Sequence, residues 1–279
     1  MSFIWNKKTM VDHQLFTNEV DGHHYNSRKT NESNKSNLKD ILLKNYFLFE
    51  NDKIFIPANI KHIKFDIGLS YSAPQSQIWL SNEDNLLVFG FEPNVNSVKS
   101  LYDPNNKKRD SCHGDVISTK FINDKFFIAP IALSNVSNDS IDFYITEVDE
   151  GCSSIFEPNV NFYKVQDIIK VPVFTLSDFF ELLPLDKINF IEYIKIDAQG
   201  SDLNIIKGGE KYISEKVVFV TLEPENNQYK RSEYNSYKNI KNYMNSIGFN
   251  EINHPNTTDP TFLNSKFIEE SKNIYINQI

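Results

Sequence analysis

Cysteine is scarce in this sequence: Cys112 and Cys152 are the two cysteines among 279 residues. Two thiols are too few for a disulfide framework or for a cysteine-rich zinc site. Such sparse use of cysteine favours a reducing compartment, so we predict a cytoplasmic protein. Long apolar runs are missing as well. No stretch approaches the roughly 18 consecutive apolar residues that indicate a membrane-spanning helix. The first ten residues contain no apolar segment typical of a secretory signal, so we expect none.

Basic residues are in deficit, and arginine is the rarest of the charged types. The chain has 29 Lys and Arg against 37 Asp and Glu, and its formal net charge is −8. A protein that binds duplex nucleic acid needs a basic face, so this balance argues against a nucleic-acid partner. Lysine is a hydrated point charge and a poorer clamp for phosphate or carboxylate than arginine.

What is present is an ordinary globular mixture, with 40% hydrophobic and 24% charged residues. This is enough to build a core. Residues 1–37 are polar and are predicted to be an N-terminal extension, with residues 31–37 forming a loop or linker. Residues 38–279 are predicted to form a single domain that carries an insertion at about residues 136–175.

Segments typical of buried strands alternate with helical segments. The clearest is 86–91, a continuous apolar run of the kind found in strands buried on both faces. This alternation predicts an α/β fold with a doubly wound, mostly parallel sheet of seven strands. We place these strands at residues 60–68, 86–91, 126–133, 190–197, 217–223, 249–253 and 273–276. Two further short strands, at 141–145 and 165–174, predict a small antiparallel insertion.

Acidic and small residues gather where the predicted strands end. Asp66 and Gly68 end the first strand, and Glu92 follows the second. A glycine lets the backbone turn and approach a ligand closely, and an acidic residue about 20 positions later can accept hydrogen bonds from ribose hydroxyls. The turn lacks the Gly-x-Gly-x-x-Gly pattern, and Tyr71 and Pro74 occupy the region that a pyrophosphate needs. The pattern therefore indicates a nucleoside cofactor without a pyrophosphate, which S-adenosylmethionine satisfies.

Five short motifs, in order along the chain, resemble those of the FkbM-type methyltransferases. They are Phe65-Asp66-Ile67-Gly68, the run 88–94, the run 131–134, Gly151-Cys152-Ser153-Ser154, and the run 193–209. The resemblance covers about residues 60–223. It implies a class I, Rossmann-like methyltransferase that uses S-adenosylmethionine. It also implies an O-methyltransferase whose small-molecule or glycan acceptor offers a sugar hydroxyl. The sequence departs from the family's pattern in the first turn and at Gln199 and Asp202, where Glu is frequent.

The resemblance and the strand ends together predict a set of site residues. Those predicted to bind the cofactor are Asp66, Gly68, Leu69, Ser70, Glu92, Pro93, Ala132 and Leu133. Those predicted to bind the substrate are Ser153, Ser154 and Glu223. No residue is predicted to bind a metal, and dependence on a divalent metal stays open.

Lys195 and Asp197 are the predicted catalytic residues. Side chains repeat every two residues along a strand, so these two share one face. We expect Asp197, nearest the strand end, to orient or deprotonate the acceptor hydroxyl. Lys195 would hold that carboxylate or a substrate oxygen. The alternative is a purely structural ion pair, and His113 and His254 are rival bases.

Two other functions compete with the methyltransferase hypothesis. The unusual first turn and Gln199 are compatible with a catalytically silent domain that binds a cofactor or a partner. A nicotinamide oxidoreductase would need a phosphate-cradling turn that the sequence lacks. Homo-oligomerisation is compatible with the sequence, with the insertion as its contact surface.

Overall fold

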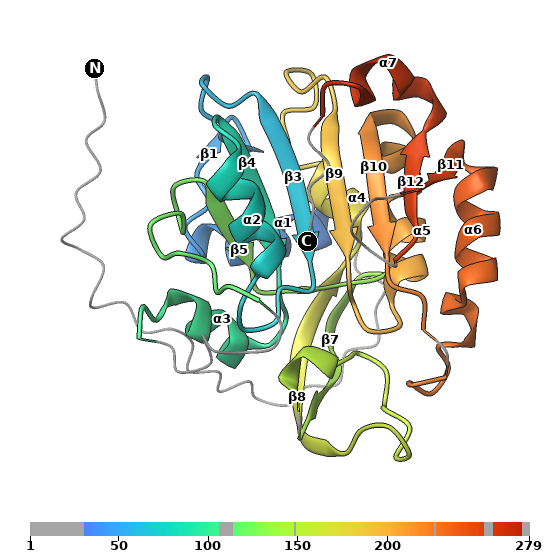
Figure 1. The fold of residues 1–279 in the computed structure, drawn as a ribbon. Coiled ribbons are helices and arrows are strands. Elements are labelled where there is room, and N and C mark those ends of the chain that lie inside the picture. Colours follow the sequence, from blue (N-terminus) through green and yellow to red (C-terminus); the bar gives the residue numbers. More distant parts are fainter. Residues whose placement is uncertain (1–30, 106–113, 148, 226, 254–258, 275–279) are drawn as a thin grey trace.

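The computed structural model describes residues 31–105, 114–147, 149–225, 227–253 and 259–274. Within these ranges, seven strands form one sheet in the order β11-β12-β10-β9-β3-β4-β5 (Figure 1). The neighbours from β10 to β5 pair in parallel, whereas β12 runs antiparallel to both β10 and β11. The prediction of an α/β fold with a mostly parallel, seven-stranded sheet is therefore confirmed. The strands are β3 (His62–Ile67), β4 (Leu86–Phe91), β5 (Phe126–Ala129), β9 (Ile191–Ile196), β10 (Val217–Leu222), β11 (Phe249–Ile252) and β12 (Thr261–Asn264).

Side chains alternate between the two faces of this sheet, and each face has its own apolar cluster. In β4, Leu87 and Phe89 belong to one cluster, and Val88 belongs to the other. Helices α1 (Asn31–Lys44), α4 (Leu176–Phe180), α5 (Asp202–Lys216) and α6 (Tyr237–Ser246) contribute to the first cluster, and α2 (Pro74–Asn82) and α3 (Val95–Tyr102) to the second. Burial on both faces explains why the central strands are continuously apolar.

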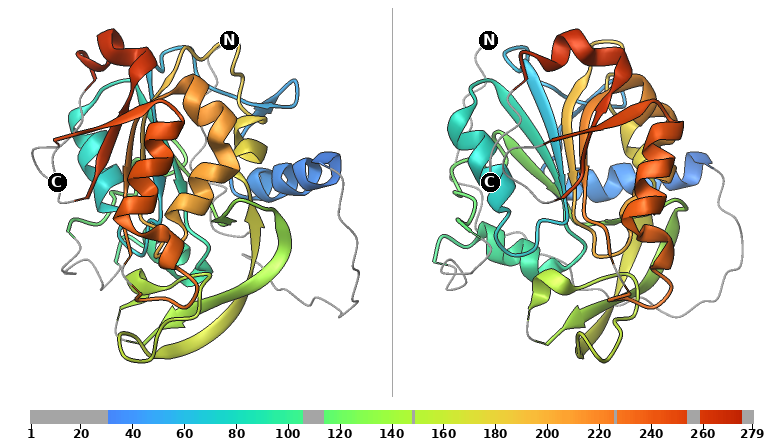
Figure 2. Two further views of the ribbon diagram at one scale, coloured as in Figure 1. Left: turned by 90° about the vertical axis from the view of Figure 1, so that its right-hand side faces the viewer. Right: turned by 45° about the vertical axis from the view of Figure 1, so that its right-hand side comes forward.

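A second sheet of three strands lies beyond the carboxyl ends of the first (Figures 1 and 2). It consists of β6 (Ala132–Leu133), β7 (Asn138–Thr146) and β8 (Val165–Phe174). Strands β7 and β8 pair antiparallel, whereas β6 pairs with β8 in parallel. The expected single strand at 126–133 is thus two strands. The chain leaves the main sheet after Ala129 and joins the second sheet at Ala132.

The first helix corrects one prediction. Residues 31–37, predicted to be a loop or linker, form the first half of α1. Leu38 and Leu42, one turn apart, are fully buried, and Lys35 lies 3.4 Å from the Glu181 carboxylate. Packing of this face holds a polar segment in a helix that its composition alone does not favour. After α1, a short hairpin of β1 (Phe49–Glu50) and β2 (Lys53–Ile54) leads to β3.

The last strand was predicted in the wrong place. Residues 261–264 form β12, whereas Asn273 and Ile274 lie in a turn after α7 (Ile268–Ser271); residues 275 and 276 lie outside the described ranges. The described ranges also contain the short 3-10 helices η3 (Glu150–Cys152), η4 (Glu233–Asn235) and η5 (Ser265–Phe267). In the described part of the chain, every helix is too short or too polar to cross a membrane.

Candidate active site

A cavity of about 390 Å³ opens at the carboxyl ends of the parallel strands, and both sheets line it. This is where open α/β sheets bind ligands, and the volume suits a small molecule. The order of the strands reverses here, because β4 follows β3 on one side and β9 flanks it on the other. Most of the predicted site residues line this cavity: Gly68, Leu69, Ser70, Glu92, Pro93, Ala132, Leu133, Ser153, Lys195, Asp197 and Glu223.

The turn after β3 passes very close to the turn after β9. Gly68 has a φ of +86°, and its N–H donates to the carbonyl of Phe91 (3.0 Å). A Cβ placed on Gly68 would lie 1.8 Å from the carbonyl oxygen of Asp197. Only glycine fits this position, both for its backbone conformation and for the available space.

Glu92 ties the end of β4 to the glycine turn. Its carboxylate accepts hydrogen bonds from the N–H of Ser70 (2.7 Å) and from the N–H of Asn94 (2.8 Å). Burial raises the pKa of Glu92 to about 7, against the opposing effect of these two hydrogen bonds. The carboxylate keeps further lone pairs for a ligand hydroxyl.

Two serine hydroxyls in the same turn are buried and lack partners. Ser70 Oγ and Ser72 Oγ make no hydrogen bond, and both residues line the cavity. Buried polar atoms are normally satisfied, so unpaired hydroxyls beside a cavity suit a polar ligand that completes them. Together with the carboxylate of Glu92, these groups fit the ribose and amino-acid parts of S-adenosylmethionine.

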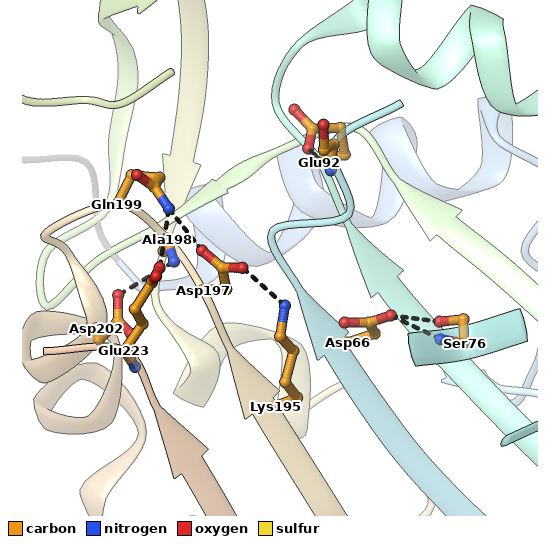
Figure 3. Close-up of polar contacts among 10 residues, drawn as sticks. Asp66, Ser76, Glu92, Lys195, Asp197, Ala198, Gln199, Asp202 and Glu223 are labelled. Atoms are coloured by element: carbon orange, nitrogen blue, oxygen red, sulfur yellow. Dashed lines mark hydrogen bonds and ion pairs between the residues drawn. The ribbon is translucent and has the colours of Figure 1, made fainter. Parts of the chain in front are cut away.

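The predicted catalytic pair lies at the end of β9 (Figure 3). Lys195 Nζ donates to Asp197 Oδ2 at 2.9 Å. On the other side, the amide nitrogen of Gln199 donates to Asp197 Oδ1 (2.7 Å) and to Glu223 Oε2 (2.9 Å). An ammonium, two carboxyl groups and one amide therefore form a continuous polar cluster along the cavity wall.

Charge is distributed unequally within this cluster. Burial disfavours the ammonium of Lys195, but the charges of Asp197 and Asp66 outweigh burial and raise the pKa of Lys195. Burial likewise opposes ionisation of Asp197, but the Lys195 ammonium overcomes it and lowers the pKa of Asp197. Burial, followed by the charge of Asp197, raises the pKa of Glu223. The two carboxyl groups thus hold one proton between them near neutral pH: Asp197 is ionised and Glu223 is protonated.

Asp202 holds the ends of two strands together from the first turn of α5. Its carboxylate accepts from the N–H of Ala198 (3.1 Å) and from the N–H of Glu223 (2.8 Å), and it is fully buried. Ala198 follows β9, and Glu223 follows β10. Asp202 therefore fixes the spacing between Asp197 and Glu223.

Sequence reasoning missed Tyr229 and named Gln199 only as a departure from the family. Gln199 has a φ of +50°, a strained conformation for a residue with a side chain. The hydroxyl of Tyr229 lies 2.6 Å from Gln199 Oε1 and 2.7 Å from the carbonyl oxygen of Cys152. The Gln199 amide thus turns its oxygen toward the Tyr229 hydroxyl and its nitrogen toward the carboxyl groups of Asp197 and Glu223. Tyr229 comes from a polar loop after β10, and no local pattern indicates this contact.

Two predicted site residues are not part of the cavity lining. Asp66 accepts hydrogen bonds from the N–H (3.1 Å) and the hydroxyl (2.6 Å) of Ser76, and its Oδ1 is buried without a hydrogen-bond partner. Ser154 Oγ donates to the carbonyl of Gln199 (2.7 Å) and accepts from the N–H of Phe156. Both positions support the turns that line the cavity. His113 and His254, the rival bases, lie outside the described residues, as does Cys112.

No metal site is evident among the residues that the structure describes. A group of three or more His, Cys, Asp or Glu side chains arranged to hold a metal ion is not found among these residues.

Comparison with known proteins finds one matching domain family and a similar solved structure. A domain family described as "Methyltransferase FkbM domain" matches residues 78–251. Among solved structures, the chain is similar to the methyltransferase FkbM from Methylobacillus flagellatus KT, at 14% identity and a TM-score of 0.41. The alignment covers 75% of this chain and 44% of that one, so the chain spans less than half of the solved relative's length. A search of curated proteins finds no match.

Proposed function

The chain belongs to the FkbM methyltransferase domain family, and from this premise we propose that it is an S-adenosylmethionine-dependent O-methyltransferase. The acceptor is a hydroxyl of a sugar, in a glycan or a glycosylated metabolite. The sheet is proposed to be the doubly wound sheet of a class I methyltransferase, carried by residues 38–279 with residues 136–175 as an insertion. The enzyme is proposed to act in the cytoplasm.

One observation carries the proposal: an ionised carboxylate, Asp197, lines the cavity next to the glycine turn of the proposed cofactor site. Methyl transfer to a hydroxyl needs the acceptor oxygen aligned with the methyl group and one proton accepted. A carboxylate between the two binding regions is placed to do both. The ion pair with Lys195 keeps that carboxylate charged.

The cofactor half of the cavity fits S-adenosylmethionine in its donor groups. The glycine turn would hold the amino-acid part through Leu69 and Ser70, and Glu92 would accept from the ribose hydroxyls. Pro93, Ala132 and Leu133 would enclose the adenine with apolar surface. When bound, the cofactor supplies a methyl group activated by its sulfonium.

The acceptor half is formed by the polar cluster. Asp197 would accept a hydrogen bond from the acceptor hydroxyl, hold its oxygen in line and receive its proton. Lys195 would keep Asp197 oriented, and Glu223 would donate to a neighbouring acceptor oxygen through its retained proton. Ser153 would contact the acceptor from the second sheet. Ser154 and Asp66 would support the walls behind these residues.

Calorimetric titration with S-adenosylhomocysteine, with and without Mg²⁺, tests the cofactor assignment. Saturable binding is expected in both buffers. Absence of binding to folded protein would refute the methyltransferase proposal and favour a silent domain of the same fold. A gain that requires Mg²⁺ would instead direct attention to Asp197 and Asp202 as metal ligands.

Asp197→Ala then tests the catalytic role. Turnover is expected to fall at least about a hundredfold, within the usual contribution of a positioned acid or base. Binding of S-adenosylhomocysteine should be retained. Asp142→Ala is a matched control, because Asp142 forms an exposed ion pair with Lys170 (2.7 Å) in the second sheet. Unchanged turnover in the Asp197 variant would refute this assignment.

A further inference from the structure

The wall of the cavity is strongly acidic. Of the described residues that line it, six are acidic and one is basic: Glu92, Glu150, Asp197, Glu223, Glu225 and Asp259 against Lys195. The charge of Lys195 is already engaged by Asp197 at 2.9 Å. With Glu223 protonated, the negative charges of Glu150 and Asp259 remain beside this ion pair. An anionic acceptor would therefore meet repulsion and find no uncommitted cation among these lining residues.

Three of these acidic residues gather on one side of the cavity. Glu223 and Glu225 follow β10. Asp259 lies just before β12, the strand next to β10 in the sheet. Residues proposed to hold the cofactor follow β3 and β4, on the other side of β9. The carboxyl groups beyond β10 therefore belong to the acceptor half of the cavity.

Glu225 is the residue in this group that lacks a side-chain partner. It is 4% exposed, its Oε2 is buried without a hydrogen bond, and it lines the cavity. Its backbone N–H donates to the carbonyl of Asn235 (3.2 Å), which fixes the residue in place. A buried carboxyl oxygen without a donor is costly, and a donor supplied by a ligand would remove that cost.

The surroundings favour a cationic donor over a neutral one. Burial, followed by the negative charges of Asp197 and Asp259, raises the pKa of Glu225 to about 7. A neutral hydroxyl would satisfy the oxygen and leave this like-charge repulsion intact. An ammonium would satisfy the oxygen and also offset the repulsion.

We propose that the acceptor carries a protonated primary amine, which Glu225 binds, beside the hydroxyl that receives the methyl group. The acceptor class is thus an amino sugar, or a similar amino alcohol, with a free amine. The inference rests on the proposed methyltransferase function, because it names the acceptor of that reaction. The acidic wall excludes phosphorylated and carboxylated sugars, and an N-acylated sugar lacks the ammonium that Glu225 would bind.

Matched probes test the inference on protein saturated with S-adenosylhomocysteine. Glucosamine, N-acetylglucosamine and glucose 6-phosphate are titrated near neutral pH, and their dissociation constants are measured by ligand-observed NMR. Glucosamine is expected to bind at least about tenfold more tightly than the other two, the effect of one charge-assisted hydrogen bond. Equal or tighter binding of either other probe, or no saturable binding of glucosamine, would overturn the inference.

A pair of variants assigns the preference to Glu225. In Glu225→Gln the preference for glucosamine should fall at least about tenfold, because the amide keeps the shape and loses the charge. Glu157→Gln is the matched control, since Glu157 is exposed and pairs with Lys230 outside the cavity. A preference that persists in Glu225→Gln overturns the assignment. Thermal unfolding of both variants verifies that they are folded.

The proposed methyltransferase function is tested by a measurement that does not depend on the amine probes. Titration of S-adenosylhomocysteine against the unmodified protein reports on the cofactor half alone. Failure of that titration refutes the methyltransferase, whatever the amine probes do. Successful titration combined with no amine preference refutes only the acceptor class.

Discussion

The carbonyl oxygen of Asp197 occupies the space that a side chain on Gly68 would need, 1.8 Å from an ideal Cβ. Two turns that are far apart in the sequence, after β3 and after β9, are thereby brought into backbone contact. The N–H of Asp197 also donates to the carbonyl of Ile67 (2.9 Å), which locks the two turns together. The proposed cofactor turn and the proposed catalytic carboxylate are thus parts of one rigid unit.

Gly68→Ala should disrupt this unit. We expect a loss of about 3 kcal/mol or more in the free energy of unfolding, from positive-φ strain plus overpacking, and a loss of affinity for S-adenosylhomocysteine. Gly248→Ala is the control, because Gly248 also has a positive φ (+92°) but has open space around its Cβ position. It should cost about 1–2 kcal/mol, the strain alone. Urea unfolding compares the two, and equal losses would contradict the predicted clash.

Tyr229→Phe should slow catalysis without weakening cofactor binding. The change removes one hydroxyl that fixes the amide of Gln199, so the amide can rotate away from Asp197 and Glu223. We expect kcat to fall about fivefold to tenfold, the effect of one hydrogen bond, while the KM for the methyl donor stays within about twofold. Tyr237→Phe, at an exposed tyrosine that contacts Glu251, should leave both constants unchanged. A rise in KM alone would argue against a positioning role.

Asp202→Ala should destabilise the fold. Two partly buried backbone N–H groups, of Ala198 and Glu223, would lose their acceptor. Each unsatisfied buried donor costs about 1–3 kcal/mol, and because these two are only partly buried we expect a loss of about 2–4 kcal/mol in the free energy of unfolding. Asp202→Asn keeps one acceptor oxygen and should lose less. Asp186→Ala, at an exposed turn position, should be nearly neutral. Chemical denaturation measures all three, and a neutral Asp202→Ala would refute the bridging role.

Stability of the ligand-free protein should fall as the pH rises from about 4.5 to about 7. Over this range Glu92 keeps its proton when folded and loses it when unfolded, because burial raises its pKa to about 7. The native state then binds more protons, so the free energy of unfolding decreases with pH, by about 3 kcal/mol for this residue. Glu225, Asp202 and Asp66 shift in the same direction. Asp197, which shifts downward, titrates below this window. Urea unfolding at several pH values measures this change. A free energy of unfolding that rises over this pH range would contradict the prediction.

The central strands were predictable because their signal is local. In β4 every residue is buried, and the apolar run ends where the strand ends. Strand β12 gives no such signal, because its four residues begin with Thr261 and end with Asn264 and its pairing with β10 is nonlocal. The start of α1 was missed for a related reason: contacts with distant residues stabilise it, and its own composition does not.

The predicted site residues divide in the same way. Residues at the ends of parallel strands, such as Glu92 and Asp197, were identified because all such ends meet at one edge of the sheet. Tyr229 reaches the same cluster from a polar loop, and the path of such a loop is not encoded in any periodic pattern. The positive φ of Gln199 could not be predicted from the sequence either, because the glycine that follows it, Gly200, is the residue for which a positive φ is expected. The roles assigned to all these residues stay predictions.

Each of the two sheets forms part of the cavity wall and packs around an apolar cluster of its own. The glycine turn and Glu92 belong to the main sheet, whereas Phe143 and the segment 150–153 belong to the β7–β8 hairpin and its connecting loop. That hairpin packs around its own apolar cluster, which includes Val171 and Val173. Exchange of the hairpin between relatives would therefore replace one wall of the cavity as a unit. Such an exchange would keep the glycine turn and Glu92 on the main sheet and renew the segment that faces them.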